Sequence, residues 1–176
     1  MTRPSRVYVV DAIRLFVKAN PDTGSFDNLY EVRKVLECGT AELAALRRTE
    51  EDLEALRKAA QQMELKCHDA IEYTRADLAF HKGLARATHN ELFLLLLEPI
   101  TELLLRAILL GRGSGGIDSG IKAHKAILRC VEERDAVGAK QLMLNHVKDS
   151  RHYARGELGH RQAGSKEHIE DQERAE

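Results

Sequence analysis

The chain has 176 residues, of which 43% are hydrophobic and 31% are charged, a length and composition that suit one domain with a hydrophobic core. Its 27 lysines and arginines almost balance its 28 aspartates and glutamates, which gives a formal net charge of -1. This balance excludes the basic excess with which a DNA-binding face neutralises phosphates, so we do not expect the chain to read DNA by itself.

Residues 1–27 are predicted to be a linker that precedes the domain. In this segment SRVYVV has strand composition, and DAIRLFVKAN could form a short helix before the turn residues PDTGS. From there the pattern is helical, with Asp27 as the expected cap of the first helix. The apolar stripe of this helix is Leu29, Val32, Leu36 and Leu43.

The next helices have clear start signals. Thr49 and Asp52 form a capping-box pattern at the start of a second helix. The inward residues of that helix are expected to be Leu53, Leu56, Ala60 and Met63. A third helix is predicted over residues 71–88, and Asn90 is the expected cap of a fourth, leucine-rich helix.

The leucine-rich segment LFLLLLEPITELLLRAILL, residues 92–110, is about as long as a membrane-spanning helix needs to be. Glu98, Glu102 and Arg106 recur at four-residue spacing, so they line one stripe and give the helix a solvated side. We therefore expect a core helix and no membrane contact. Three cysteines without paired spacings, and an N-terminus without the apolar core of a signal peptide, favour the reducing cytoplasm.

The segment GRGSGGIDSG, residues 111–120, is predicted to be a flexible connection to two last helices near residues 121–133 and 136–156. Residues 158–176 show no apolar periodicity and are predicted to be a polar, disordered tail. The expected fold class is all-α, an antiparallel bundle of about six helices with an interior metal or ligand pocket. Its domain is expected to occupy residues 28–157.

Asp77 and His81, in the run DLAFH, lie one helical turn apart. They share a stripe with Phe80 and Leu84, so both side chains are expected to face the core. A buried carboxylate is costly unless a partner neutralises it. Because an i,i+4 Asp-His pair is also common at a helix surface or as a satisfied core pair, this motif alone leaves a metal site and a structural pair both open.

Two further histidines lie on apolar stripes, His124 with Leu128 and His146 with Leu142. They precede and follow the turn at Arg134 by nearly equal numbers of residues. In an antiparallel pair of helices, that symmetry puts both imidazoles at the same height, about 15 Å from the turn at a rise of 1.5 Å per residue. The two side chains can therefore meet.

One aspartate and three histidines are a suitable first shell for Zn²⁺, Ni²⁺ or Mn²⁺, and the sequence does not choose among these divalent metals. A metal with more than four coordination positions would keep places open for water or for an oxygen of a ligand. The remaining histidines show no such register and are expected at the surface or in the tail: His68, His89, His152, His160 and His168.

Three runs resemble a known family: LYEVRKVLECGTAELAALRRTEEDLEALRKAAQQM, DLAFHKGLARATHNELFLLLLEPI and HKAILRCVEERDAVGAKQLMLNHV. They are similar to the effector-binding C-terminal (FCD) domain of FadR-type regulators in the GntR superfamily, over about residues 28–150. The resemblance implies an all-helical bundle that binds a metal through Asp77, His81, His124 and His146. It further implies a small organic acid as effector, with Arg33 paired to its carboxylate, and we expect a homodimer.

In this family a winged helix-turn-helix domain precedes the sensor, and about 27 residues are too few to form one. We therefore expect a sensor half that reaches DNA only through a missing or partner DNA-binding domain, with SRVYVV as a possible remnant of the final wing strand.

The expected function is metal-dependent sensing of a small carboxylate in a transcription regulator, without enzymatic activity. Two alternatives stay open at this point. One is a helical-bundle metalloenzyme that uses an open metal position, although the Glu-x-x-His signature of di-iron bundles occurs once, at Glu157 and His160, where two are required. The other is a metal-free dimerisation module.

Overall fold

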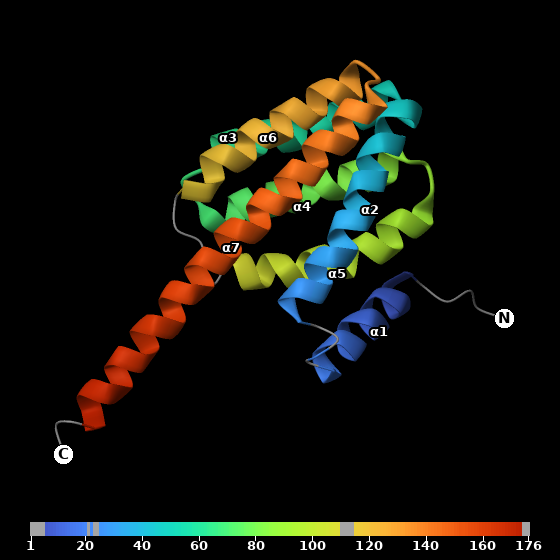
Figure 1. The fold of residues 1–176 in the computed structure, drawn as a ribbon. Helices are drawn as coiled ribbons and strands as arrows, with labels where there is room; N and C mark the ends of the chain where they lie inside the picture. Colours follow the sequence, from blue (N-terminus) through green and yellow to red (C-terminus); the bar gives the residue numbers. More distant parts are fainter. Residues whose placement is uncertain (1–5, 21, 23–24, 110–114, 174–176) are drawn as a thin grey trace.

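The computed structural model describes the backbone of residues 6–20, 22, 25–109 and 115–173, and the side chains of residues 6–20, 22, 25–104 and 116–154. The described part of the chain forms seven helices and no strand, which confirms the predicted all-α class (Figure 1). The helices are α1 Arg6–Ala19, α2 Phe26–Arg47, α3 Glu50–Leu65, α4 Ala70–Ala87, α5 Glu91–Leu109, α6 Gly115–Glu132 and α7 Ala136–Glu173.

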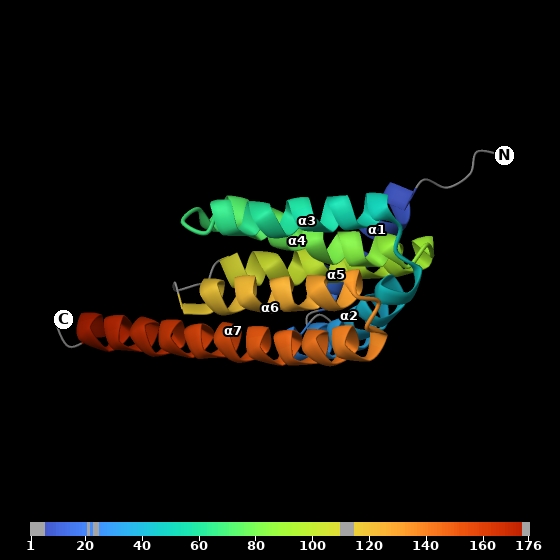
Figure 2. The ribbon, with the colours of Figure 1, turned by 90° about the horizontal axis from the view of Figure 1, so that it is seen from above.

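The helices are arranged in layers around α4. Short turns join α3 to α4 and α6 to α7, and each of these pairs packs side by side. α2 lies along α7 and also packs against α4, while α5 covers another side of α4. Seen from above, most of the helices run roughly along one direction, and the C-terminal half of α7 projects beyond the ends of its neighbours (Figure 2). The residues that α4 buries are therefore at the centre of the bundle.

The predicted helix starts at α3 and α5 are confirmed. Thr49 and Asp52 form the reciprocal capping box of α3, because the Thr49 hydroxyl accepts from the Asp52 backbone N–H while the Asp52 carboxylate accepts from the Thr49 N–H. Asn90 accepts a hydrogen bond from the Leu92 backbone N–H through Oδ1. The inward residues predicted for α3 are all buried: Leu53, Leu56, Ala60 and Met63.

The buried face of α2 differs from the predicted one. Val32 is 45% exposed and Leu29 and Leu36 are half-buried, whereas Arg33 and Glu37 are buried. Ser25, not Asp27, caps the helix. Small side chains explain the choice of face, because they let α2 approach its neighbours closely while the polar pair is satisfied internally. The buried alanines of this face are Ala41, Ala44 and Ala45.

The N-terminal segment forms a helix where a strand remnant or a short helix was expected. α1 packs against α5 and buries Val10. Arg6 pairs with Glu98, and Arg14 pairs with Glu102. The side of α5 that was predicted to be solvated is therefore partly covered, and the Glu98 side chain is only 14% exposed.

Two other predictions differ from the structure. The predicted connection at residues 111–120 is helical from Gly115 onward, and residues 110–114 lie outside the described residues. Close packing explains why residue 120 in this segment is a glycine, since a Cβ there would lie 2.5 Å from the Tyr73 hydroxyl oxygen. The backbone of α7 continues to Glu173, through the stretch predicted to be a disordered tail. That stretch is rich in Glu, Gln, Arg and Ala, which favour helix even without an apolar face.

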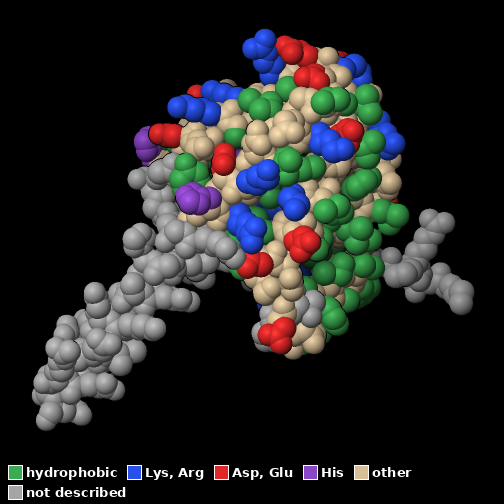
Figure 3. Space-filling model, viewed as in Figure 1, with side chains coloured by type: hydrophobic (Ala, Val, Ile, Leu, Met, Phe, Trp, Pro, Cys, Tyr) green, Lys and Arg blue, Asp and Glu red, His purple; other side chains and the backbone are tan. Residues whose placement is uncertain are grey.

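Within the described residues, no helix is both long enough and apolar enough to cross a membrane. Large apolar side chains are nevertheless exposed, many of them on α1, α2 and α5. Figure 3 shows hydrophobic side chains gathered along one edge of the molecule, over α1 and the adjacent parts of α2 and α5. Among the exposed residues of these helices are Val7, Tyr8, Leu15, Phe16, Val32, Val35, Leu92 and Leu96.

Two glycines inside helices provide a matched test of the packing between α3 and α4. Gly39→Ala should raise the free energy of unfolding by about 0.5–1 kcal/mol, because alanine favours helix and nothing lies within 4 Å of the added Cβ. Gly83→Ala should lower it, because the added Cβ would lie 2.8 Å from Cδ2 of Leu56, which is fully buried. Guanidinium denaturation of both variants measures the difference. Equal stabilisation by the two substitutions would contradict the packing described here.

Candidate metal centre

Four side chains from three helices meet in the middle of the bundle. α4 contributes Asp77 and His81, α6 contributes His124 and α7 contributes His146, and all four are buried. One ligand atom from each residue lies within 4.8 Å of the corresponding atoms of the others. The structure thus brings together all four residues that the sequence singled out, in a cluster that could hold a metal ion.

The turn between α6 and α7 sets the height of two of the imidazoles. α6 ends at Glu132 and α7 begins at Ala136, so the helices run antiparallel from a short turn. His124 and His146 consequently face each other, with ring centroids 4.4 Å apart. The centroid of His81 lies 5.1 Å from that of His124 and 5.4 Å from that of His146, so the three rings form one compact group.

The tautomer of His124 is set by the backbone of its own helix. Nδ1 lies 2.6 Å from the carbonyl oxygen of Gly120, and a carbonyl can only accept, so Nδ1 carries the proton. Nε2 then presents its lone pair to the cluster, 3.2 Å from His81 Nε2 and 3.4 Å from Asp77 Oδ1. Burial lowers the pKa of His124 to about 4, against the opposing effect of Asp77. The side chain is therefore neutral at physiological pH, as a metal ligand must be.

A fifth buried polar group, Glu37 of α2, adjoins the cluster. Its Oε2 lies 3.1 Å from Nδ1 of His81, at ion-pair distance but without the alignment of a hydrogen bond. Its Oε1 accepts a hydrogen bond of 2.7 Å from Nε of Arg33. Burial alone would raise the pKa of Glu37, but the charge of Arg33 and the contact with His81 outweigh it and hold the pKa at about 2. Glu37 is therefore an ionised carboxylate inside the core.

Arg33 reaches the cluster from α2 and is itself buried. Its Nη2 lies 3.4 Å from Nε2 of His81, and its Nη1 donates to Oγ of Ser150 at 3.3 Å. The hydroxyl groups of Ser150 and Tyr30 are 3.1 Å apart, and the guanidinium lies over the Tyr30 ring. The position predicted for a carboxylate-binding arginine is thus inside the bundle, beside the four residues that could hold a metal, rather than at the surface.

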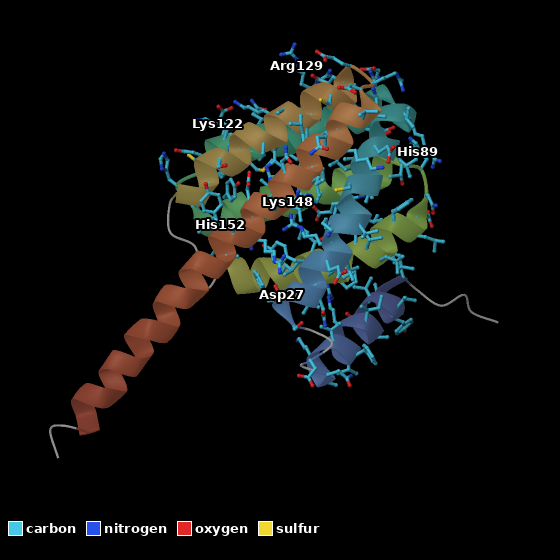
Figure 4. All side chains as sticks on the ribbon, viewed as in Figure 1. Asp27, His89, Lys122, Arg129, Lys148 and His152 are labelled. Carbon is cyan, nitrogen blue, oxygen red and sulfur yellow. The ribbon has the colours of Figure 1, made fainter. Side chains whose placement is uncertain are left out.

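Three polar neighbours of the cluster were not predicted from the sequence: Glu37, Ser150 and Tyr30. A signal for Glu37 was present, because it follows Arg33 by one helical turn and could have been its ion-pair partner. Ser150 likewise follows His146 by one turn of α7. The histidines predicted to lie outside the site and whose side chains are described are exposed: His68, His89 and His152, the last two labelled in Figure 4.

The donor set fits a divalent transition metal. Imidazole nitrogens and a carboxylate oxygen are the ligands that Zn²⁺ takes in proteins, and two of the imidazoles have a polar partner on the ring nitrogen opposite the cluster. Such outer partners fix the ring orientation and the tautomer of a metal-binding histidine. The chemistry of the residues present therefore agrees with the metal site implied by the sequence.

Metal-free protein should lose stability as the pH falls from about 6.5 to about 4. His124 in the folded protein takes up a proton only near its lowered pKa of about 4, whereas the unfolded imidazole does so near 6.5. Over this range the unfolded chain binds more protons, so a lower pH favours unfolding. Urea denaturation at pH 7 and pH 5 should show a smaller loss for His124→Gln than for the wild type. An equal loss in both proteins would contradict this assignment.

Comparison with known proteins identifies a family for most of the chain. The FCD domain model matches residues 28–149. The HTH-type transcriptional regulator LutR of Bacillus subtilis is 37% identical over 125 residues, covering 68% of this chain and 57% of LutR. The Uxu operon regulator of Haemophilus influenzae is 28% identical over 155 residues, covering 82% of this chain and 58% of that protein. Both relatives are named as regulators and neither as an enzyme.

A solved structure of similar fold is that of Streptococcus agalactiae GntR, with a TM-score of 0.63 and 28% sequence identity. The match covers 71% of this chain and 57% of that one. The chain therefore spans a little over half the length of the curated relatives and of this structure. The match over residues 28–149 and the shared fold show that the chain belongs to the FCD domain family, the effector-binding C-terminal domains of GntR-type transcription regulators.

Proposed function

We propose that this domain senses a small carboxylate through a bound metal ion, as part of a GntR/FadR-type transcription regulator. The observation that carries the proposal is the placement of Arg33. Its guanidinium Nη2 lies 3.4 Å from Nε2 of His81, beside four buried groups that could hold a metal. A guanidinium and a metal ion side by side can bind the two oxygens of one carboxylate.

The charge of the centre favours the same pair of ligands. Among the buried side chains that the structure describes, two carboxylates, Glu37 and Asp77, accompany one guanidinium, that of Arg33. With neutral imidazoles the centre carries a net negative charge, which is costly inside a core. A divalent cation would make it net positive, and one carboxylate of an effector would then restore neutrality. Metal and acid together therefore make the net charge of the centre zero, which neither does alone.

Zinc is the metal we propose. Asp77, His81, His124 and His146 would be its ligands, and four ligands of the nitrogen and carboxylate type suit Zn²⁺. Ni²⁺ and Mn²⁺ accept the same donors and have positions beyond four. When bound, the metal would act as a positively charged contact for an oxygen of the acid. The residues of this chain would orient that acid, with Arg33 holding its carboxylate.

The DNA-binding part of the regulator is proposed to lie outside the described helices. The near balance of charge on the chain supports this division, since it lacks the basic excess of a DNA-binding surface. We propose that a winged helix-turn-helix domain, joined to the sensor or held by a partner chain, reads DNA in response to the acid. Differential affinity of the acid for two arrangements of the helices would drive the response.

Calorimetric titration of zinc-loaded protein with small hydroxy and dicarboxylic acids tests the proposal. We expect saturable binding of at least one acid, and loss of binding in an Asp77→Ala, His81→Ala double variant because the metal contact is gone. Arg33→Lys should weaken binding by about 10- to 100-fold, because lysine keeps the charge but not the planar group that Glu37 and Ser150 hold in place. Arg57→Ala, which removes a half-exposed arginine of α3, is the control. Absence of binding to the wild type, or equal binding to the double variant, would contradict the proposal.

We also propose that the domain forms a homodimer through the apolar edge on α1, α2 and α5. Val35 of α2 is 66% exposed. Tyr8 and Leu15 lie two turns apart on the same face of α1 and are 72% and 69% exposed. Sedimentation equilibrium should show a dimer that Val35→Glu weakens. Leu65→Glu, which charges a 63% exposed apolar residue at the end of α3, should leave it intact. A monomeric wild type, or equal effects of the two substitutions, would contradict the interface.

A further inference from the structure

The carboxylate of Glu37 contacts both Arg33, which is proposed to bind the acid, and His81, which is proposed to bind the metal. Its side chain is fully buried, Oε1 accepts from Nε of Arg33 at 2.7 Å, and Oε2 lies 3.1 Å from Nδ1 of His81. Arg33 is the group proposed for the acid, and His81 is one of those proposed for the metal.

The contact with His81 determines which ring nitrogen faces the metal ligands. A carboxylate beside Nδ1 stabilises a proton on that nitrogen, so the lone pair is left on Nε2. Nε2 points toward the cluster, where it lies 3.2 Å from Nε2 of His124. The other tautomer would place a hydrogen on Nε2 and exclude His81 from binding a cation.

The contact with Arg33 fixes the direction of its guanidinium. Nε is held by Glu37 and Nη1 by Ser150, so the planar group is anchored at two of its three nitrogens. That anchoring turns Nη2 toward His81. An arginine held in this way loses less side-chain freedom when it binds a carboxylate, which strengthens binding.

We infer that Glu37 is a positioning residue that prepares His81 for the metal and Arg33 for the acid at the same time. The inference rests on the proposed function, because the acid and the metal are proposed there. Nε of Arg33 donates to one oxygen of Glu37, and Nδ1 of His81 lies at ion-pair distance from the other, so only a carboxylate can favour an N–H on both sides. A carboxamide of the same shape offers one acceptor and one donor, so it can serve Arg33 or His81 but not both.

The first measurement uses metal-free wild-type protein and nitrogen-15 NMR of the histidine rings. His81 should carry its proton on Nδ1, and His124 should do so as well because of the Gly120 carbonyl. A predominant Nε2-protonated form of His81 would overturn the inference. This measurement needs neither a variant nor a bound ligand, so its result tests the inference whether or not any acid is found to bind.

The second measurement compares Glu37→Gln with Glu42→Gln, which removes a carboxylate from the same helix but outside the centre, where Glu42 pairs with Lys140. Zinc affinity, measured by competition with a chromophoric chelator, should fall by about 10- to 100-fold in the first variant and stay unchanged in the second. In Glu37→Gln the His81 proton should also move toward Nε2. A folded Glu37→Gln protein with wild-type zinc affinity and an unchanged tautomer would overturn the inference.

The two proposals can fail separately. If wild-type protein binds zinc but no acid, the sensor function fails, while the tautomer and zinc affinity still decide the role of Glu37. If wild-type protein binds an acid and Glu37→Gln binds both zinc and that acid equally well, the role of Glu37 fails and the sensor function stands.

Discussion

The buried contact between Glu37, Arg33 and His81 is the constraint on which the centre of this bundle depends. Charged groups inside a core are tolerated only when each is paired, and the carboxylate of Glu37 pairs with two groups on two helices. This contact holds α2 against α4, and it accounts for the choice of a polar, alanine-rich face of α2 as the buried one. The exposed valines of α2 are the consequence, because the opposite face remains outside.

The other helices complete the centre by simple geometry. A short turn between α6 and α7 brings His124 and His146 to one height, and the helical repeat of α4 places Asp77 and His81 on one face. Each helix thus supplies its donor from a rigid element, which suits a site whose ligand atoms must stay within a few ångströms. The Gly120 carbonyl and Glu37 add the outer contacts that orient two of the rings.

Much of this could be predicted from the sequence, because the relevant signals were local or periodic. The capping box at Thr49 and the four metal-ligand candidates followed from spacing alone, and the family followed from the resemblance. The buried face of α2 could not be predicted in this way. Its leucines and valines give a stronger apolar pattern than the alanines and the Arg33–Glu37 ion pair, and the burial of that pair depends on partners in distant helices. The helical start of α6 was missed because glycines read as a loop unless a close neighbour such as Tyr73 is known.

The sensor function proposed for this domain requires that the cluster of Asp77, His81, His124 and His146 bind a divalent metal. Elemental analysis by plasma mass spectrometry, on protein purified without chelator, measures this. We expect about one transition-metal ion per chain, most simply zinc. Metal-free protein whose melting temperature is the same with and without added zinc would contradict it.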